Sequence, residues 1–219
     1  MISNYKKKKF EIIIFSILLL LPIFIDSYYL DNISYFMCWT FISLGLAVIW
    51  GMGGILSFGQ TAFFGLAGYA FSVISINFLG IAGVSIWSVI LSLIITGIFG
   101  MIVGYFLFYG GIYDVFIGIV TLAITLVLET FMQQTAGPEY TIGIARLNGF
   151  NGMQGMPTIG FESLQFGLLE GVTQYYFILL LAIIILISLY KFKQSKIGLV
   201  FLASKEDRER VSSLGHNVQ

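Results

Sequence analysis

Polar side chains that could bind a small molecule gather in a glycine-rich stretch, GMGGILSFGQTAFFGLAGY, at positions 51–69. Ser57, Gln60 and Thr61 carry hydrogen-bonding groups there, where a lipid-facing helix would have none. Each glycine costs a helix about 1 kcal/mol relative to alanine. In lipid, irregular backbone persists only where it is buried in protein or lines a cavity. The stretch therefore predicts either a closely packed seam between helices or a substrate path beside a broken helix.

Residue types that support catalysis are scarce elsewhere. His216, the only histidine, lies in a charged tail, and Cys38, the only cysteine, lies in an apolar run. No serine–histidine–aspartate set or metal cluster can be assembled in the apolar segments, and no phosphate loop of the Gly-x-x-x-x-Gly-Lys-Ser/Thr type occurs. We therefore expect no enzymatic activity and no cofactor bound by this chain.

Two carboxylates, Asp114 and Glu129, lie near opposite ends of one apolar segment. Intramembrane carboxylates usually face a bundle interior or a water-filled cavity. Groups near the ends of a span can also reach water among the lipid headgroups, so the sequence leaves the role of both residues open.

Composition places the chain in a membrane. Its 219 residues are 58% hydrophobic and 10% charged, with zero net charge, whereas a soluble domain carries about 25% charged residues. Zero net charge also removes the electrostatic basis for nucleic-acid binding. The basic start, Lys6 to Lys9, precedes an apolar run that has no small-residue cleavage site, so we expect a retained first span and not a cleaved signal.

The apolar segments predict an all-α, polytopic membrane protein with about six transmembrane helices. Lysines before the first span and after the last place both termini in the cytoplasm under the positive-inside bias. The connection 133–171 is then external, and its apolar content predicts a folded cap against the helices. The expected spans are 10–30, 33–51, 54–78, 83–108, 112–132 and 172–190.

The glycine-rich stretch resembles the signature of permease subunits from ATP-driven importers of branched-chain amino acids, urea and short amides. FIGIVTLA at 116–123 and GFNGMQGMP at 149–157 are similar to two further segments of that family. Met52, where the family usually has an aromatic residue, departs from the pattern. The resemblance implies a translocation path or helix-packing role for Gly51, Gly54, Ser57, Gly59, Gln60, Phe63, Gly65, Gly68 and Tyr69.

The charged tail, SKIGLVFLASKEDRERVSSLGHNVQ, could simply be a solvated amphipathic helix, with a break and a second start at Leu214. It also resembles the cytoplasmic coupling segment of the same permeases, which docks into a groove of the ATPase subunit. Ser204 and Arg208 depart from the family pattern. The resemblance implies an ATPase-coupling role for Ser195, Gly198, Ala203, Lys205, Glu206, Glu209, Leu214 and Gly215.

The resemblance further implies a single, partial permease domain over 1–219, with a cytoplasmic coupling segment at 191–219, in the inner membrane of a prokaryote. Its expected partners are ATPase subunits that use ATP, a second homologous permease in a heterodimer, an external substrate-binding protein and membrane lipids. Family members continue with further spans, so we expect the chain to be C-terminally truncated, as a fragment or as a truncated gene.

A second hypothesis is an ion-coupled secondary transporter or channel subunit with a glycine-broken helix at 51–60. That mechanism needs ionisable groups near the membrane midplane, which Asp114 and Glu129 do not obviously supply. Between a branched-chain amino acid and urea or another amide, the sequence leaves the substrate open.

Overall fold

The computed structural model describes residues 14–112, 115–160 and 171–217. These residues form two compact units, which are described separately. The first unit contains residues 14–41 and 171–187, and the second contains 42–112, 115–160 and 188–217.

The first unit is built from the apolar helix Ile14–Ile23 and from parts of α2 (Ser27–Leu46) and α6 (Gly171–Gln194). Its core is the cluster of Leu30, Tyr175 and Leu179. The Tyr175 hydroxyl, which would be costly to bury unpaired, donates to the Leu18 carbonyl oxygen over 2.6 Å. This unit is therefore held by apolar packing and by hydrogen bonds between its helices.

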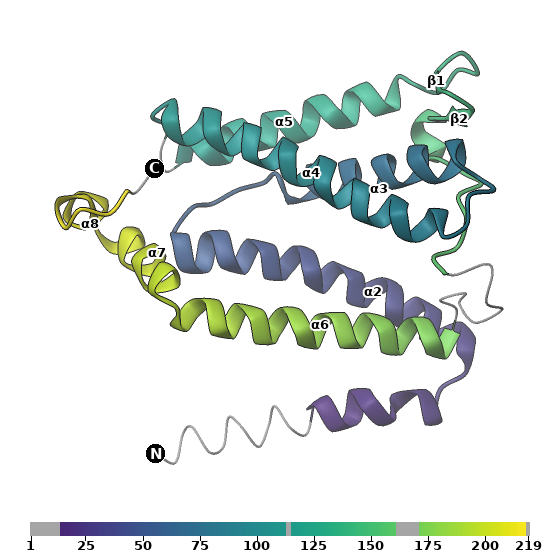
Figure 1. The fold of residues 1–219 in the computed structure, drawn as a ribbon, viewed down its shortest axis with the longest axis horizontal. Coiled ribbons are helices and arrows are strands. Elements are labelled where there is room, and N and C mark those ends of the chain that lie inside the picture. The colour runs from purple at the N-terminus through teal and green to yellow at the C-terminus, as the bar shows by residue number, and fades with distance from the viewer. Residues whose placement is uncertain (1–13, 113–114, 161–170, 218–219) are drawn as a thin grey trace. The chain divides into compact units, whose positions relative to one another are not determined.

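The second unit carries most of the sequence features singled out above. Helices α3, α4 and α5 lie side by side in it (Figure 1). Its elements are the π-helical turn η2 (Ala47–Met52), α3 (Gln60–Asn77), α4 (Val84–Tyr109), α5 (Val115–Gln133), β1 (Thr141–Ile142), β2 (Ala145–Arg146), the 3₁₀ turn η3 (Gly149–Asn151), α7 (Lys196–Glu206) and α8 (Arg208–Ser213).

Four helices in the described part of the chain are long and apolar enough to cross a membrane: Ser27–Met52, Val84–Tyr109, Val115–Gln133 and Gly171–Gln194. With almost no sheet, this confirms an all-α, polytopic membrane protein. The first expected span, 10–30, lies partly outside the described residues, and its described part holds the shorter helix Ile14–Ile23. The expected start of the third span at residue 54 is wrong, because α3 begins only at Gln60.

The connection after α5 folds against the helices over the residues described. Antiparallel strands β1 and β2 form a hairpin, and Ala145, Leu147 and Met153 pack on Ile76 of α3. The Asn77 side chain donates to the Ile142 carbonyl oxygen over 2.7 Å. Apolar contacts and side-chain hydrogen bonds to backbone together hold this connection in a defined conformation.

Candidate functional site

The glycine-rich stretch opens with a break between two helices. The π-helical turn η2 ends at Met52, and α3 starts after its N-cap, Gly59. Residues 54–59 between them are neither helix nor strand. Gly54 has φ +71°, a left-handed conformation that only glycine adopts without strain. The position of the break can therefore be predicted from Gly54, but the length of the non-helical segment cannot.

Two threonines of α5 satisfy the backbone within this break. The Phe58 amide donates to Thr121 Oγ1 over 3.0 Å, and Thr125 Oγ1 donates to the Phe58 carbonyl oxygen over 3.1 Å. Gly118, one helical turn before Thr121, would place a Cβ only 3.4 Å from the Leu56 carbonyl oxygen. Helix α5 therefore presents a small residue and two hydroxyls to the non-helical backbone of this segment, which meets the hydrogen-bonding demand of a membrane interior.

Thr121 and Thr125 are not among the expected site residues, although Thr121 falls in the segment 116–123. Their signal is two threonines spaced by four in an otherwise aliphatic helix, a spacing that puts both on one face. A hydroxyl in such a helix can bond its own backbone, as Thr121 does to the Ile117 carbonyl oxygen over 2.8 Å. The contact with Phe58 therefore needs the tertiary structure to be seen.

Helix α7 packs directly on the start of the break. The Phe201 ring occupies the space where a side chain on Gly53 would lie. The Lys205 ammonium donates to the Gly51 carbonyl oxygen over 3.3 Å, and Lys205 Cγ would be 2.8 Å from a Cβ on Gly54. The structure thus brings together residues that the sequence placed in two separate groups, and Phe201 is a contact that sequence reasoning missed.

The start of α7 is fixed by its own residues. Ser195 is the N-cap, and its Oγ accepts from the Gly198 amide over 3.1 Å. The same hydroxyl donates to the Phe192 carbonyl oxygen over 2.7 Å, at the end of α6. Gly198 is buried, and a Cβ there would collide with that carbonyl oxygen. Ser195 and Gly198 therefore set a sharp turn between α6 and α7.

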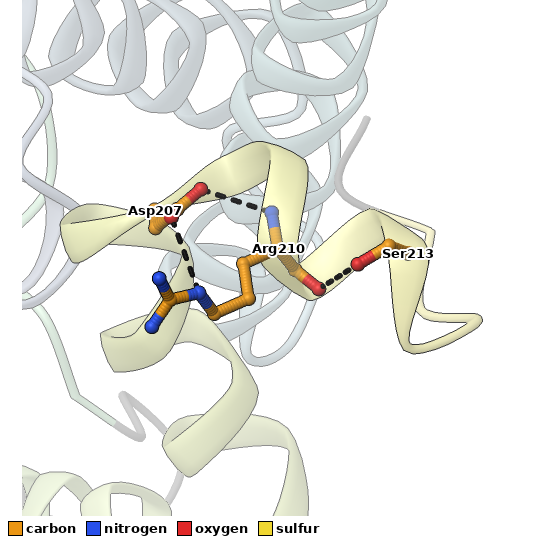
Figure 2. A network of polar contacts seen from close by, with 3 residues as sticks. All are labelled: Asp207, Arg210 and Ser213. Atoms are coloured by element: carbon orange, nitrogen blue, oxygen red, sulfur yellow. Dashed lines mark hydrogen bonds and ion pairs between the residues drawn. The ribbon is translucent and has the colours of Figure 1, made fainter.

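A second short helix follows at once, and its start differs from the expectation at Leu214. Asp207 is the N-cap of α8, and its Oδ1 accepts from the Arg210 amide over 2.9 Å (Figure 2). Its Oδ2 also lies 3.4 Å from Arg210 Nε, and Ser213 Oγ donates to the Arg210 carbonyl oxygen over 2.8 Å. Leu214 instead caps the C-terminal end of α8. Among the residues expected to couple to the ATPase, those with exposed surfaces are Ala203, Lys205, Glu206, Glu209, Leu214 and Gly215.

A pocket of about 530 Å³ lies between α3, α5 and the η3 turn. Gly65 and Tyr69 of α3, both expected site residues, line it together with Thr125 and Glu129 of α5. A Cβ on Gly65 would meet no atom within 4 Å, so the missing side chain leaves open space. The wall is completed by Thr61, Ala62, Leu66, Leu128, Met132, Gln133, Gly149 and Phe150.

The remaining expected residues serve the surrounding packing. The Ser57 hydroxyl is buried and accepts from the Gly59 amide over 3.2 Å. Phe63 lies edge-on to Phe99 of α4, with ring centroids 5.7 Å apart. Gln60 starts α3. Gly68 is exposed and does not line the pocket. Gly53 and Gly59 are therefore closely packed, whereas Gly65 and Gly68 lie beside open space.

Fold and site together define a polytopic α-helical membrane protein with a broken helix beside a pocket. Residues 28–219 match the family model described as branched-chain amino acid transport system, permease component. The match spans well over half of the chain, so the chain belongs to that family of transport permeases. No curated protein and no solved structure matches it.

Proposed function

We propose that this chain is the transmembrane permease subunit of an ATP-binding-cassette importer, and that it forms part of the path for a branched-chain amino acid or a related small amide. Membership of the permease family supports the transport role. The observation that carries the importer mechanism is the packing of α7 on the glycine turn at Gly53 and Gly54. Because of this packing, a movement of α7 would directly displace the backbone at the start of the break.

The route continues from the break to the pocket. Thr125 donates to the Phe58 carbonyl oxygen in the non-helical segment 54–59 and also lines the pocket. A displacement of α7 would therefore be passed through Gly53 and Phe58 to the pocket wall. Packed interfaces of this kind switch between discrete arrangements when one element is pushed, as alternation between outward-open and inward-open states requires.

The partners follow from this mechanism. ATPase subunits dock on the α7–α8 segment and bind the ATP, while this chain binds no cofactor and has no enzymatic activity. A second, homologous permease completes the path as a heterodimer, and a substrate-binding protein docks on the side of the connection 133–171. The assembly lies in the inner membrane of a prokaryote, in contact with lipid, with both termini of this chain in the cytoplasm.

An ion-coupled secondary transporter is the alternative. The non-helical backbone at 54–59 is compatible with it as well, since broken helices form substrate sites in such proteins. It would need ionisable groups near the midplane. Glu129 lies in the last turns of α5, and Asp114 lies outside the described residues.

Vesicles distinguish the two functions. The chain is expressed together with the proposed partners, namely the ATPase subunits, a second permease and a substrate-binding protein, and uptake of radiolabelled leucine is measured. We expect uptake to require ATP inside the vesicle and to persist when ion gradients are collapsed. Uptake driven by a proton or sodium gradient without ATP would replace this proposal with the alternative.

A further inference from the structure

The turn η3 carries a phenylalanine at the pocket between α3 and α5. Gly149 and Phe150 of this turn line the pocket, and its other lining residues lie on α3 or α5. The Phe150 side chain is 78% exposed, so it contributes little to the packed interior of the second unit. A substitution of Phe150 should therefore change access to the pocket more than it changes the fold.

The backbone around Phe150 is closed into a compact turn. Asn148 has φ +65°, and in the described part of the chain no other residue except glycine has a positive φ. The Asn148 side chain donates from Nδ2 to the Gly152 carbonyl oxygen over 3.0 Å. The Gly152 amide in turn donates to the Gly149 carbonyl oxygen over 3.1 Å. A turn that is closed by its own hydrogen bonds holds Phe150 in a defined position and can move as one body.

Contacts on both sides attach this turn to the helices that border the pocket. Gly149 is buried, and a Cβ there would lie only 2.7 Å from Ala136 Cα, in the chain that follows α5. Leu147 and Met153, which flank the turn, pack with Ile76 in the last turn of α3. The turn therefore bridges the ends of α3 and α5. A movement of one helix relative to the other would displace Phe150 with respect to the pocket.

The pocket also borders the break before α3. Thr61, in the first turn of α3, and Thr125 both line it, and Thr125 donates to the Phe58 carbonyl oxygen within the break. The pocket thus has a non-helical segment on one side and the η3 turn on the other. A transporter that exposes a fixed site alternately to the two sides of a membrane needs a closure on each side of that site.

We propose that Phe150 is the outer gate of this pocket. Its ring obstructs the entrance from the side of the connection 133–171, and a shift of α3 against α5 withdraws the turn and uncovers the pocket. The inference rests on the proposed importer function and adds the element that closes the path opposite the break. The break, which contacts α7, is then the end of the pocket on the ATPase side.

The test measures how fast a cysteine in the pocket reacts from outside the membrane. Leu66→Cys, at a half-buried position on the pocket wall, is introduced after Cys38→Ala has removed the native thiol of this chain. Right-side-out vesicles that hold the complex with its proposed partners are treated with a membrane-impermeant thiol reagent. We expect addition of Phe150→Ala to accelerate labelling of this chain several-fold, because loss of the ring opens the entrance.

A matched control and two further variants separate gating from folding. Ile144 is 71% exposed in the same connection and does not line the pocket, so Ile144→Ala should leave the labelling rate unchanged. Phe150→Tyr keeps the ring and should label at the parent rate, whereas Phe150→Leu should label faster. Because Phe150 is exposed, Phe150→Ala should unfold near the parent temperature. If it unfolds at a lower temperature, the comparison of Phe150→Tyr with Phe150→Leu decides.

Two labelling results would overturn the inference. One is an equal rate in the parent and Phe150→Ala, or in Phe150→Tyr and Phe150→Leu where that pair decides. The other is an equal acceleration by Ile144→Ala, which would show that any change in the connection exposes the pocket.

A second reporter tests the side of the membrane. Thr158, exposed in the same connection, is replaced by cysteine, and Thr158→Cys should be labelled in intact vesicles whatever residue stands at position 150. Labelling of Thr158→Cys only after the vesicles are lysed would place the connection inside and would also overturn the inference.

The gate and the importer function fail separately. Faster labelling in Phe150→Ala, combined with no ATP-dependent uptake of leucine by the wild type, would keep Phe150 as the closure of the pocket and refute the importer function. Unchanged labelling in Phe150→Ala, combined with ATP-dependent uptake by the wild type, would refute the gate alone.

Discussion

The Lys205 ammonium donates a hydrogen bond to the Gly51 carbonyl oxygen over 3.3 Å, which ties α7 to the last turn of the helix that precedes the break. A cation at the C-terminal end of a helix is stabilised by the free carbonyl groups there. The bond is exposed, so its contribution is about 0.5–1 kcal/mol. The tighter link is steric, because the Phe201 ring fills the space that Gly53 leaves empty.

Gly53→Ala should therefore uncouple α7 from the break. A methyl group there would collide with the Phe201 ring, and the ring or the helix must move. We expect ATPase activity of the complex to continue while leucine uptake per ATP falls several-fold. Gly51→Ala is the matched control, since a Cβ at Gly51 meets nothing within 4 Å. Equal uptake per ATP in both variants would remove this contact from the coupling mechanism.

Thr121→Val should destabilise the second unit. Valine keeps the shape of threonine but removes the acceptor of the partly buried Phe58 amide, and loss of such a hydrogen bond costs about 1 kcal/mol. A lowered unfolding temperature in detergent is the expected readout. Thr121→Ser keeps the hydroxyl and should unfold near the wild-type temperature. Thr130→Val, at an exposed site on the same helix, should have little effect on the unfolding temperature. Wild-type stability of Thr121→Val would mean that the Phe58 amide finds another acceptor.

Ser195→Ala should loosen the start of α7. Its hydroxyl caps the Gly198 amide, and loss of an N-cap costs about 1 kcal/mol. Hydrogen exchange at the amides of Gly198 and Leu199 should accelerate roughly five-fold, in line with that free energy. In Ser195→Asp, which keeps an acceptor, these amides should exchange at close to the wild-type rate. Ser212→Ala, at an exposed position of α8, serves as the control. Unchanged protection in Ser195→Ala would show that the cap is dispensable.

Gly65→Leu should block the pocket without unfolding the protein. The new side chain would enter open space, and leucine favours helix over glycine by up to about 1 kcal/mol. We expect leucine uptake to fall at least several-fold while the unfolding temperature stays the same or rises. Gly68→Leu, one turn further along α3 and outside the pocket, should retain more uptake. If Gly68→Leu proves as harmful as Gly65→Leu, the pocket is not the feature that limits transport.

Much of the architecture follows from local sequence. Long apolar segments predict the helices, because a lipid environment forces each to satisfy its own backbone. Caps such as Ser195 are also local, since the acceptor and donor lie three residues apart. The sequence even marks the break at Gly54, although α3 starts at Gln60 and not at residue 54. Gly54 interrupts the helix locally, but the apolar residues after it could start a new helix at once, and the bonds of Phe58 to Thr121 and Thr125 show how the non-helical backbone is satisfied instead.

The sequence by itself determined a polytopic helical membrane protein, a glycine-marked break and a charged tail. Only the tertiary structure decided that Phe58 bonds Thr121, 63 residues away, that Lys205 reaches Gly51, 154 residues away, and that Gly65 and Glu129 share a pocket. The physical reason is the distance along the sequence over which each interaction acts. Hydropathy and capping act within a few turns of helix, whereas these contacts depend on which helix faces pack together, and a single sequence does not encode that pairing in any local pattern.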